Sequence, residues 1–401
     1  MKQLVSYFTA AIAACGFANA EDWPQFRGPS GNSARFEKLE IDWTRPNVVA
    51  WRSPLPGRGP SSPIVVGERV FVTASSGVHQ DRLHVLCFDA RDGKKLWERQ
   101  FWATGRTITH PSSANAAPTP ASDGEHVFAF YSSNDLAALD LDGNLLWYRG
   151  LAFDYPKTGN DVGMSSSPIV IGDTVIVQVE NQGDPFAAGI DATSGETKWR
   201  IERRRGAAWC SPIPLRKPGA RGAVLLQSSD RITAHDPATG SELWAHKRSC
   251  DVISTTATDG GILFVPSEGI TALDTSISEN APAVVWNVST LNPGAASPVV
   301  QDGRLFIINR AGVLNCADTK TGKTLWRLRL DGSFWGTPTL AGDELVCYAD
   351  SGLVQVVKVP TDGTAGTLVG KVDLGEKIQS SAAVADGAVF LRSDSHLFKL
   401  K

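Results

Sequence analysis

A charged pair beside an aromatic residue lies in the longest link between strand patterns, which runs from Phe101 to Ala117. Arg106 and His110 stand in this link near Trp102, and such a group can bind an anionic or a sugar-like ligand. Long loops of a rigid scaffold often carry binding residues. The alternative is that both side chains cap the backbone of their own link.

Further polar candidates stand at one repeated position, directly after the second strand of successive repeats. We expect them to form a polar ring around a central axis, where such rings hold water. They are Asn134, Asp230, Asn309 and Asp350.

Several kinds of chemistry lack their motifs. The seven histidines show no H-E-x-x-H or other paired-ligand spacing, G-x-S-x-G is absent, and Gly57-Arg58-Gly59 lacks the third glycine and following helix of a nucleotide loop. The net charge of −3 and the pI of about 6.2 give no reason to expect a nucleic-acid partner. Zinc-protease, serine-hydrolase and dinucleotide-binding functions are therefore not indicated.

The candidates must be positioned by an internal repeat. Its clearest copy starts at Ser297-Pro298 and continues through Asp302-Gly303 and Asp318 to Thr321-Gly322 and Trp326. Six copies end in a tryptophan, at spacings of 50, 52, 45, 42 and 40 residues: Trp97, Trp147, Trp199, Trp244, Trp286 and Trp326. We align the starts of the seven copies at Ser62-Pro63, Ala117-Pro118, Ser167-Pro168, Ser211-Pro212, Thr256-Ala257, Ser297-Pro298 and Thr337-Pro338. A period of this length with four strand signals is typical of a β-propeller blade.

The chain ends supply the last blade. The seventh copy lacks its tryptophan, and its last strand is expected at 370–374. Three strands follow from Ser381 to Leu400, and Val48–Arg52, which contains Trp51, supplies the fourth. We predict an all-β, eight-bladed propeller of four-stranded antiparallel blades, closed by the N-terminal strand joining the C-terminal strands. The domain spans 47–401, and an arm of residues 21–46 with Trp23 and Trp43 lies against it.

Residues 1–20 have the pattern of an export signal. Lys2 precedes an apolar stretch, and Ala18-Asn19-Ala20 fits a cleavage site that leaves Glu21 first. In the competing interpretation, Ile12–Cys15 is a lipobox and Cys15 carries a lipid anchor. Both interpretations predict a periplasmic or secreted protein, and no other segment is long and apolar enough to span a bilayer.

Five cysteines remain after such cleavage, so at least one cannot pair within the chain. Cys210 and Cys250 each precede the inner strand of neighbouring repeats. A disulfide between them is one interpretation, since export leads to an oxidising compartment; free buried thiols are the other.

The A-x-D-x-x-T-G-x-x-L-W signature resembles the PQQ-like β-propeller repeat family over nearly the whole mature chain. The segments 22–29, 101–106 and 180–184 are similar to a subgroup of secreted bacterial proteins in that family. The family includes quinoprotein dehydrogenases, which hold pyrroloquinoline quinone (PQQ) and Ca²⁺ at the axis. It also includes non-catalytic members such as the envelope lipoprotein BamB. The resemblance is informative for the fold and less so for the function.

The dehydrogenase branch implies an axial carboxylate and amide that hold Ca²⁺, and an Asp base. Glu180 and Asn181 are the candidates for that pair, and Trp209 and Trp335 precede inner strands where they can line the same axial mouth. The alternative is a polar turn and two tryptophans that cap blade junctions. The adjacent cysteine pair of the alcohol dehydrogenases and a haem motif are both missing from the sequence.

We therefore expect an exported, non-catalytic binding or scaffold protein that uses its axial loop face. Its partner is an envelope protein or a small polar ligand, no cofactor is needed, and the protein is a monomer. The alternative function is a PQQ- and calcium-dependent oxidoreductase acting on alcohols or sugars. The one basic cluster, Arg200 with Arg203, Arg204 and Arg205, is expected to be a solvated strand edge.

Overall fold

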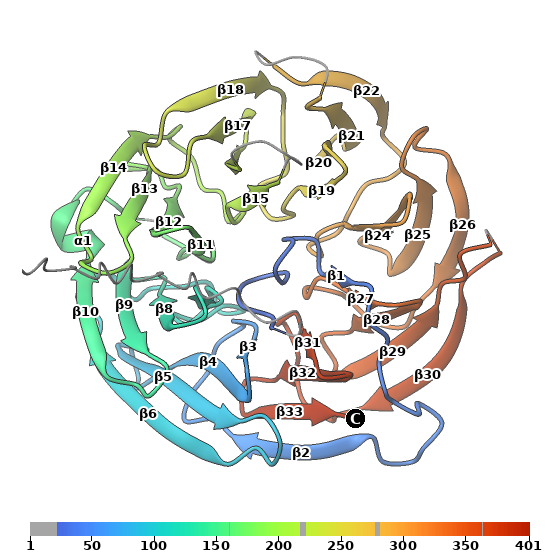
Figure 1. The fold of residues 1–401 in the computed structure, drawn as a ribbon, viewed down its shortest axis with the longest axis horizontal. Coiled ribbons are helices and arrows are strands. Elements are labelled where there is room, and N and C mark those ends of the chain that lie inside the picture. Colours follow the sequence, from blue (N-terminus) through green and yellow to red (C-terminus); the bar gives the residue numbers. More distant parts are fainter. Residues whose placement is uncertain (1–21, 160, 217–221, 277–280, 363) are drawn as a thin grey trace, which may run out of the picture.

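The computed structural model describes residues 22–401 except 160, 217–221, 277–280 and 363. Eight β-sheets stand side by side around a central axis, as Figure 1 shows in the view along that axis. Each sheet has four antiparallel strands from inside to outside, and one sheet carries an additional parallel strand. The predicted eight-bladed propeller is confirmed.

The strands of the first four blades follow one another in chain order. Blade 1 consists of β3 (Ile64–Val66), β4 (Arg69–Ser76), β5 (Arg82–Asp89) and β6 (Lys95–Trp102). Blade 2 consists of β7 (Ala121–Ser122), β8 (His126–Phe130), β9 (Asp135–Asp140) and β10 (Leu145–Gly150), followed by the short helix α1 (Leu151–Asp154). Blade 3 consists of β11 (Ile169–Ile171), β12 (Thr174–Val179), β13 (Phe186–Asp191) and β14 (Thr197–Glu202). Blade 4 consists of β15 (Ile213–Leu215), β16 (Ala223–Ser228), β17 (Arg231–His235) and β18 (Glu242–Lys247).

The remaining blades complete the ring. Blade 5 consists of β19 (Ala257–Asp259), β20 (Ile262–Ser267), β21 (Gly269–Asp274) and β22 (Ala283–Val288). Blade 6 consists of β23 (Val299–Gln301), β24 (Arg304–Ile308), β25 (Val313–Asp318) and β26 (Thr324–Arg329). Blade 7 consists of β27 (Thr339–Ala341), β28 (Glu344–Tyr348), β29 (Leu353–Lys358) and β30 (Thr367–Asp373). Blade 8 consists of β31 (Ala383–Ala385), β32 (Ala388–Arg392), β33 (His396–Leu400) and β2 (Val49–Pro54).

The N-terminal strand closes the ring as predicted. β2 pairs antiparallel with β33, and Trp51 stands opposite Lys399. A strand near the N-terminus therefore shares one sheet with the C-terminal strands, and this sheet completes the ring as blade 8. The last strand of blade 7 starts at Thr367, three residues before the predicted start.

Six of the seven repeated tryptophans join neighbouring blades, because the indole lies over a glycine of the next blade. The indole N–H of Trp147 donates to the carbonyl of Ala192 at 2.9 Å, and a Cβ on Gly195 would lie 2.7 Å from the Trp147 ring. The same contact recurs between five further pairs: Trp51 with Gly93, Trp97 with Gly143, Trp199 with Gly240, Trp286 with Gly322, and Trp326 with Gly366. Tryptophan and glycine of the signature are thus the two halves of one inter-blade contact.

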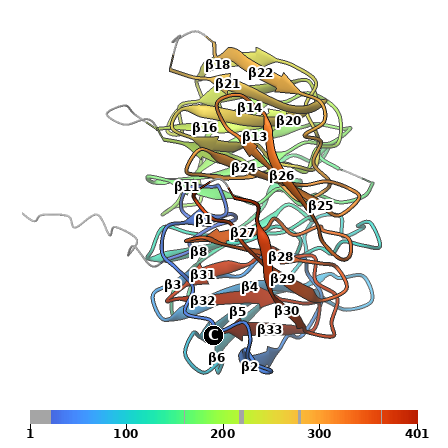
Figure 2. The ribbon, with the colours of Figure 1, turned by 90° about the vertical axis from the view of Figure 1, so that its right-hand side faces the viewer.

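The arm lies across one face of the propeller and reaches blades far apart in sequence. Trp23 forms a bridge to Val65 in blade 1, and β1 (Ala34–Arg35) adds to the inner edge of β27 in blade 7 as a parallel strand. The arm is the blue segment at the centre of Figure 1, and Figure 2 shows it on one side of the disc.

A fully buried arginine of the arm reaches the axis. The guanidinium of Arg27 donates to the carbonyls of Thr256 at 2.8 Å and Pro298 at 2.6 Å, so it joins blades 5 and 6. Burial lowers the pKa of Arg27 to about 9, which leaves the group charged at neutral pH. The arm thereby closes this end of the propeller axis.

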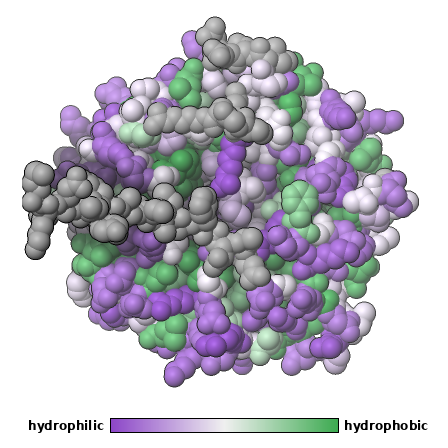
Figure 3. Space-filling model, in the orientation of Figure 1, coloured by the Kyte–Doolittle hydropathy of each residue, from purple (hydrophilic) through white to green (hydrophobic). Residues whose placement is uncertain are grey.

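The core consists of the inner strands and the spaces between blades, where nearly every hydrophobic side chain is buried. In the space-filling view of Figure 3, hydrophilic residues cover much of the visible rim and alternate with smaller hydrophobic areas. No helix within the described residues is long and apolar enough to cross a membrane. The export signal predicted for 1–20, and Cys15 within it, lie outside the described residues.

Candidate functional site

A cavity of about 380 Å³ lies at the centre of the ring of blades. It is lined by the links that lead into the inner strands and, at its inner end, by Phe26 of the arm. Its outer end is open, since His110 and Trp335 of these links are exposed. The volume lies at the lower end of the range of about 300–1,000 Å³ found for small-molecule sites.

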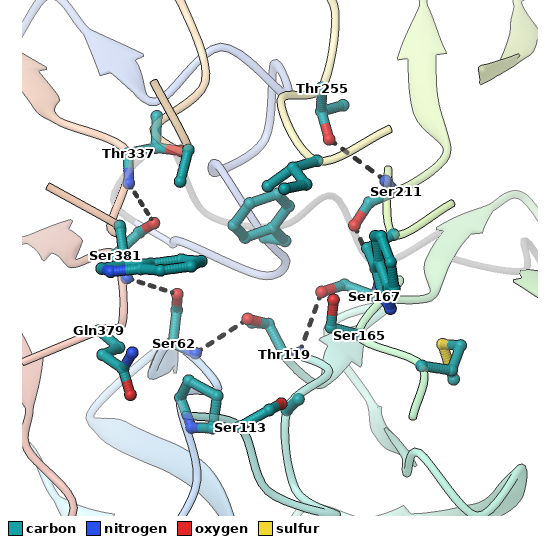
Figure 4. Close-up of a pocket in the computed structure, with 18 of the residues that line it drawn as sticks. Ser62, Ser113, Thr119, Ser165, Ser167, Ser211, Thr255, Thr337, Gln379 and Ser381 are labelled. Carbon is teal, nitrogen blue, oxygen red and sulfur yellow. Dashed lines mark hydrogen bonds between the residues drawn. The ribbon is translucent and has the colours of Figure 1, made fainter. Parts of the chain in front are cut away.

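A closed ring of eight hydroxyl groups surrounds the cavity, one from each blade. Figure 4 shows the part of this ring that runs from Thr337 through Ser381 and Ser62 to Thr255. Each hydroxyl residue stands two positions before an inner strand, and its backbone N–H donates to the hydroxyl oxygen of the next blade. The eight bonds measure 2.9 to 3.3 Å and run without interruption through Ser62, Thr119, Ser167, Ser211, Thr255, Ser297, Thr337 and Ser381.

These hydroxyl groups accept one bond each and keep a hydrogen to donate. The hydroxyl of Thr255 lies beside the Cys210 thiol. For the other seven, the structure shows no acceptor among the described residues. The ring therefore presents a set of uncommitted O–H donors around the cavity.

Aromatic side chains provide the apolar surfaces of the cavity. Trp209 and Trp335 both line it. They lie in the links that precede the inner strands of blades 4 and 7, three blades apart around the ring. The indole N–H of Trp209 donates to the carbonyl of Gly163 at 2.9 Å, which fixes the ring in place. Trp335 is 44% exposed and stands at the open mouth.

The cavity lining is uncharged apart from one titratable side chain. His110 lies at the mouth, where its Nδ1 contacts the hydroxyl of Ser112 at 2.7 Å. Among the described lining residues there is no Asp, Glu, Lys or Arg. Such a lining suits a neutral ligand, because neither a carboxylate nor a cation would find a charged partner there.

The structure separates Arg106 from His110. Arg106 lines a second, small cavity of about 20 Å³ beside the axial one, together with Asn134, Glu180 and Asn181. Its guanidinium forms an exposed ion pair with Asp161 at 2.9 Å. Asn134 adopts a positive φ of 64° in the turn between β8 and β9, a conformation that asparagine tolerates. Four of the predicted candidates thus lie together, but outside the axial cavity.

Glu180 has a structural partner that the sequence did not reveal. Arg203 forms an ion pair with Glu180 at 3.1 Å, and both side chains are buried, at 4% and 2% exposure. Ser228 and Gln178 also donate to this carboxylate. Burial raises the pKa of Glu180, against the attraction of Arg203. The prediction of a solvated basic edge is therefore wrong for Arg203.

The other members of the basic cluster differ from one another. Arg200 packs over the rings of Tyr155 and Phe186 and pairs with Asp184, whereas Arg204 pairs with Asp230 near the surface. A charged run next to a strand end can therefore hold both buried and exposed members.

Asn309 belongs to neither cavity. Its side-chain oxygen accepts from the backbone N–H groups of Ala311 and Val313, within its own turn between β24 and β25. The amide of Asn181 is used in the same way, because its oxygen accepts from the N–H of Gly183 at 2.7 Å. Both amides stabilise local turns.

Cys210 and Cys250 are free thiols, so the structure contradicts the disulfide interpretation. The Cys210 thiol donates to the carbonyls of Asp251 and Ser254, and the Cys250 thiol to the carbonyl of Arg248. Burial raises the pKa of Cys250 to about 12 and holds that of Cys210 well above its ordinary value, which makes both thiols poorly reactive.

The donor set does not fit calcium and PQQ. Ca²⁺ takes several oxygen ligands including carboxylates, but the described lining residues supply no carboxylate. Glu180 is engaged with Arg203, and the described residues contain no group of three His, Cys, Asp or Glu side chains placed to hold a metal ion. The quinone, which carries three carboxylates, would meet no Lys or Arg among these lining residues. We derive no reaction step through either group.

Blade 1 holds a hydrogen-bonded Ser–His–Glu chain that no sequence motif indicated. Ser76 Oγ contacts His84 Nε2 at 2.7 Å, and His84 Nδ1 contacts Glu98 at 2.8 Å. The three residues belong to β4, β5 and β6, and none of them lines either cavity. The chain links the three outer strands of this blade.

The hydroxyl ring is the main feature that sequence reasoning missed. The signal was present, since most repeats start with Ser-Pro or Thr-Pro. In two repeats the ring residue differs from the predicted start: it is Thr119 instead of Ala117, and Thr255 instead of Thr256. Counting back two positions from each inner strand identifies all eight residues.

The chain is similar both to outer membrane protein assembly factors and to a dehydrogenase. A curated relative, outer membrane protein assembly factor BamB of Yersinia pestis, is 25% identical over 296 residues, 71% of this chain and 70% of that protein. A polyvinylalcohol dehydrogenase of a Pseudomonas species is 24% identical over 357 residues, which cover 77% of this chain but only 50% of that enzyme.

Solved structures share the fold at lower identity. BamB from Moraxella catarrhalis matches with a TM-score of 0.63 at 18% identity, covering 88% of this chain and 97% of its own. A europium-containing methanol dehydrogenase matches with a TM-score of 0.71 at 13% identity, covering 95% and 98%. A family model described as outer membrane protein assembly factor BamB matches residues 44–206, 156–256 and 271–365. This match spans well over half of the chain, and the protein therefore belongs to the PQQ-like β-propeller family that the model describes.

Proposed function

We propose that this protein is a non-catalytic binding protein of the bacterial cell envelope that takes a small, uncharged ligand in its axial cavity. The observation that carries the proposal is the lining of that cavity. It combines the ring of eight hydroxyl groups with three aromatic side chains, and none of the described lining residues carries a carboxylate. Alcohol oxidation at a quinone needs a base, and His110 at the exposed mouth is the one titratable side chain of this lining.

The relatives support the envelope location, the binding role and the neutral ligand of this proposal. Several curated relatives are BamB proteins, whose name assigns them to outer membrane assembly. They support an envelope location and a role in binding. The polyvinylalcohol dehydrogenase supports an affinity of this fold for a neutral, hydroxyl-bearing compound.

The enzymatic alternative is tested directly. PQQ with Ca²⁺ is titrated into the purified protein by calorimetry, and dye-linked oxidation of primary alcohols and sugars is then measured. We expect neither heat nor turnover. Tight binding of PQQ with Ca²⁺, weakened in Glu180→Gln and accompanied by dye reduction, would replace the proposal by the oxidoreductase.

The envelope location is tested by cell fractionation and by mass spectrometry of the mature N-terminus. A chain that starts at Glu21 agrees with simple export, and a lipidated Cys15 agrees with membrane anchoring. Recovery of an unprocessed chain from the cytoplasm contradicts the proposed location.

A further inference from the structure

We infer that the ligand of the axial cavity is a neutral carbohydrate, held as a terminal sugar unit between aromatic surfaces and the hydroxyl ring. This inference rests on the proposed binding function and specifies the ligand class. It follows from the aromatic residues, the donor groups, the missing charges and the shape of the cavity.

The aromatic residues suit the faces of a sugar ring. A pyranose presents C–H groups on its faces, and these pack on the electron-rich face of an indole. Trp209 is fixed by its bond to Gly163, and Trp335 stands at the mouth from a link three blades away. Rigid, partly exposed indoles make such contacts at a low entropic cost.

The hydroxyl ring suits the edge of a sugar ring. Seven O–H groups have no acceptor among the described residues, and their oxygen atoms already accept one bond each. Sugar hydroxyls and the ring oxygen can accept from them directly or through water. Gln379, which also lines the cavity, adds an amide that both donates and accepts.

The charges near the cavity favour a neutral sugar over an acidic one. No Lys or Arg is among the described lining residues. Two fully buried cations lie near the lining, and both are engaged by the fold. Arg27 directs its N–H groups to the backbone carbonyls of blades 5 and 6, and Arg392 donates to the hydroxyl of Ser61 and the carbonyl of Thr73. An acidic sugar would lose its hydration without gaining a charged partner.

The shape of the cavity favours the end of a glycan. The arm closes the inner end through Phe26, while the opposite end is open. A cavity of about 380 Å³ with one mouth accepts a small unit, and the rest of a chain extends outward past Trp335 and His110.

The test is a glycan array that displays neutral and acidic mono- and oligosaccharides, probed with the labelled full-length protein. Affinities for the bound glycans are then measured by calorimetry for the wild type, Trp335→Ala and Trp209→Ala. Trp102→Ala is the matched control, because this indole is 64% exposed and lies in neither cavity. Circular dichroism confirms that each variant is folded.

We expect neutral glycans to bind and Trp335→Ala to weaken binding by about tenfold or more, with no change in Trp102→Ala. Binding to no glycan, or equal binding by the Trp335 and Trp209 variants and the wild type, overturns the inference. Preference for acidic glycans overturns it as well. A thermal-shift screen of uncharged non-sugar metabolites separates the two levels. If no glycan on the array binds but a metabolite binds the wild type and not Trp335→Ala, the proposed binding function stands and the carbohydrate inference is wrong.

Discussion

Trp43 of the arm packs against Gly370, at the register position where the other seven blades carry their own tryptophan. Gly370 stands opposite Val356 beside a register shift, as Trp326 stands opposite Cys316 beside the same shift in blade 6. A Cβ on Gly370 would lie 2.6 Å from the Cβ of Trp43, whose indole N–H donates to Glu344 at 3.1 Å. The arm thus supplies from outside the repeat the indole that the seventh repeat lacks.

Removing this indole should destabilise the ring. Trp43→Gly is expected to lower the free energy of unfolding by about 3–5 kcal/mol, the cost of truncating a buried large aromatic side chain. Adding Gly370→Trp to Trp43→Gly should recover part of this loss, because the new indole fills the same space. Urea denaturation of both variants checks the pair. Failure of the second substitution to recover any stability would contradict the proposed replacement.

The tryptophan–glycine contact can be separated from backbone strain within one blade. Gly195 and Gly172 both lie in turns of blade 3 with positive φ, of 73° and 61°. A Cβ would meet the Trp147 ring at 2.7 Å on Gly195 and nothing within 4 Å on Gly172. We expect Gly172→Ala to cost about 1 kcal/mol of stability and Gly195→Ala about 1–3 kcal/mol more. Equal thermal unfolding of the two variants would show that the contact is unimportant.

The buried pair of Glu180 and Arg203 should behave as a structural unit. Arg203→Met leaves a buried carboxylate without its cation, and we expect a loss of about 3–5 kcal/mol at neutral pH. Adding Glu180→Gln removes the charge and should recover much of that loss. A double-mutant cycle in denaturant measures this coupling. Additive effects of the two substitutions would show that the ion pair does not connect them.

Acid should weaken the fold in a range set by buried histidines. Burial lowers the pKa of His84, which faces Glu98, Arg82 and Lys95, and also the pKa of His235. Because the folded-state pKa lies below the unfolded value near 6.5, their neutral forms contribute full stability above that pH. The contribution falls as the pH drops below 6.5 and these residues charge.

Carboxylates with a lowered pKa, such as Asp89 with a pKa of about 2, contribute to the stability of the fold at neutral pH. They lose this contribution only in more acidic solution, as the pH falls below their ordinary pKa of 3.8. Melting temperatures measured between pH 7.5 and 5 should therefore fall in the wild type and fall less in a His84→Gln variant. An unchanged slope in the variant would assign the effect to other groups.

The repeat made the fold predictable, because its tryptophan and glycine mark a contact that recurs between six pairs of neighbouring blades. The same logic placed Trp51 in the closing strand and Trp209 and Trp335 before inner strands, where the structure finds them. Arg203 could not be assigned in this way. Its partner Glu180 follows β12, whereas Arg203 follows β14, and only the packing between blades 3 and 4 shows that both are buried. The hydroxyl ring is harder to predict, because blade 2 has two proline dipeptides in succession and blade 5 has Thr255-Thr256 without a proline, so the sequence leaves the register of these two repeats ambiguous.

The course of the arm has a consequence for synthesis of the protein from its N-terminus. β1 pairs with β27, Trp43 needs Gly370, and β2 pairs with β33. These three early segments have no native partner until the last blades have left the ribosome or crossed the membrane. Blades 1 to 6 can form before blades 7 and 8 are available. Blades 7 and 8 depend on β1, Trp43 and β2, which are synthesised first and remain unpaired until then. A release of the nascent chain before residue 400 would therefore leave an open ring with an unfilled edge.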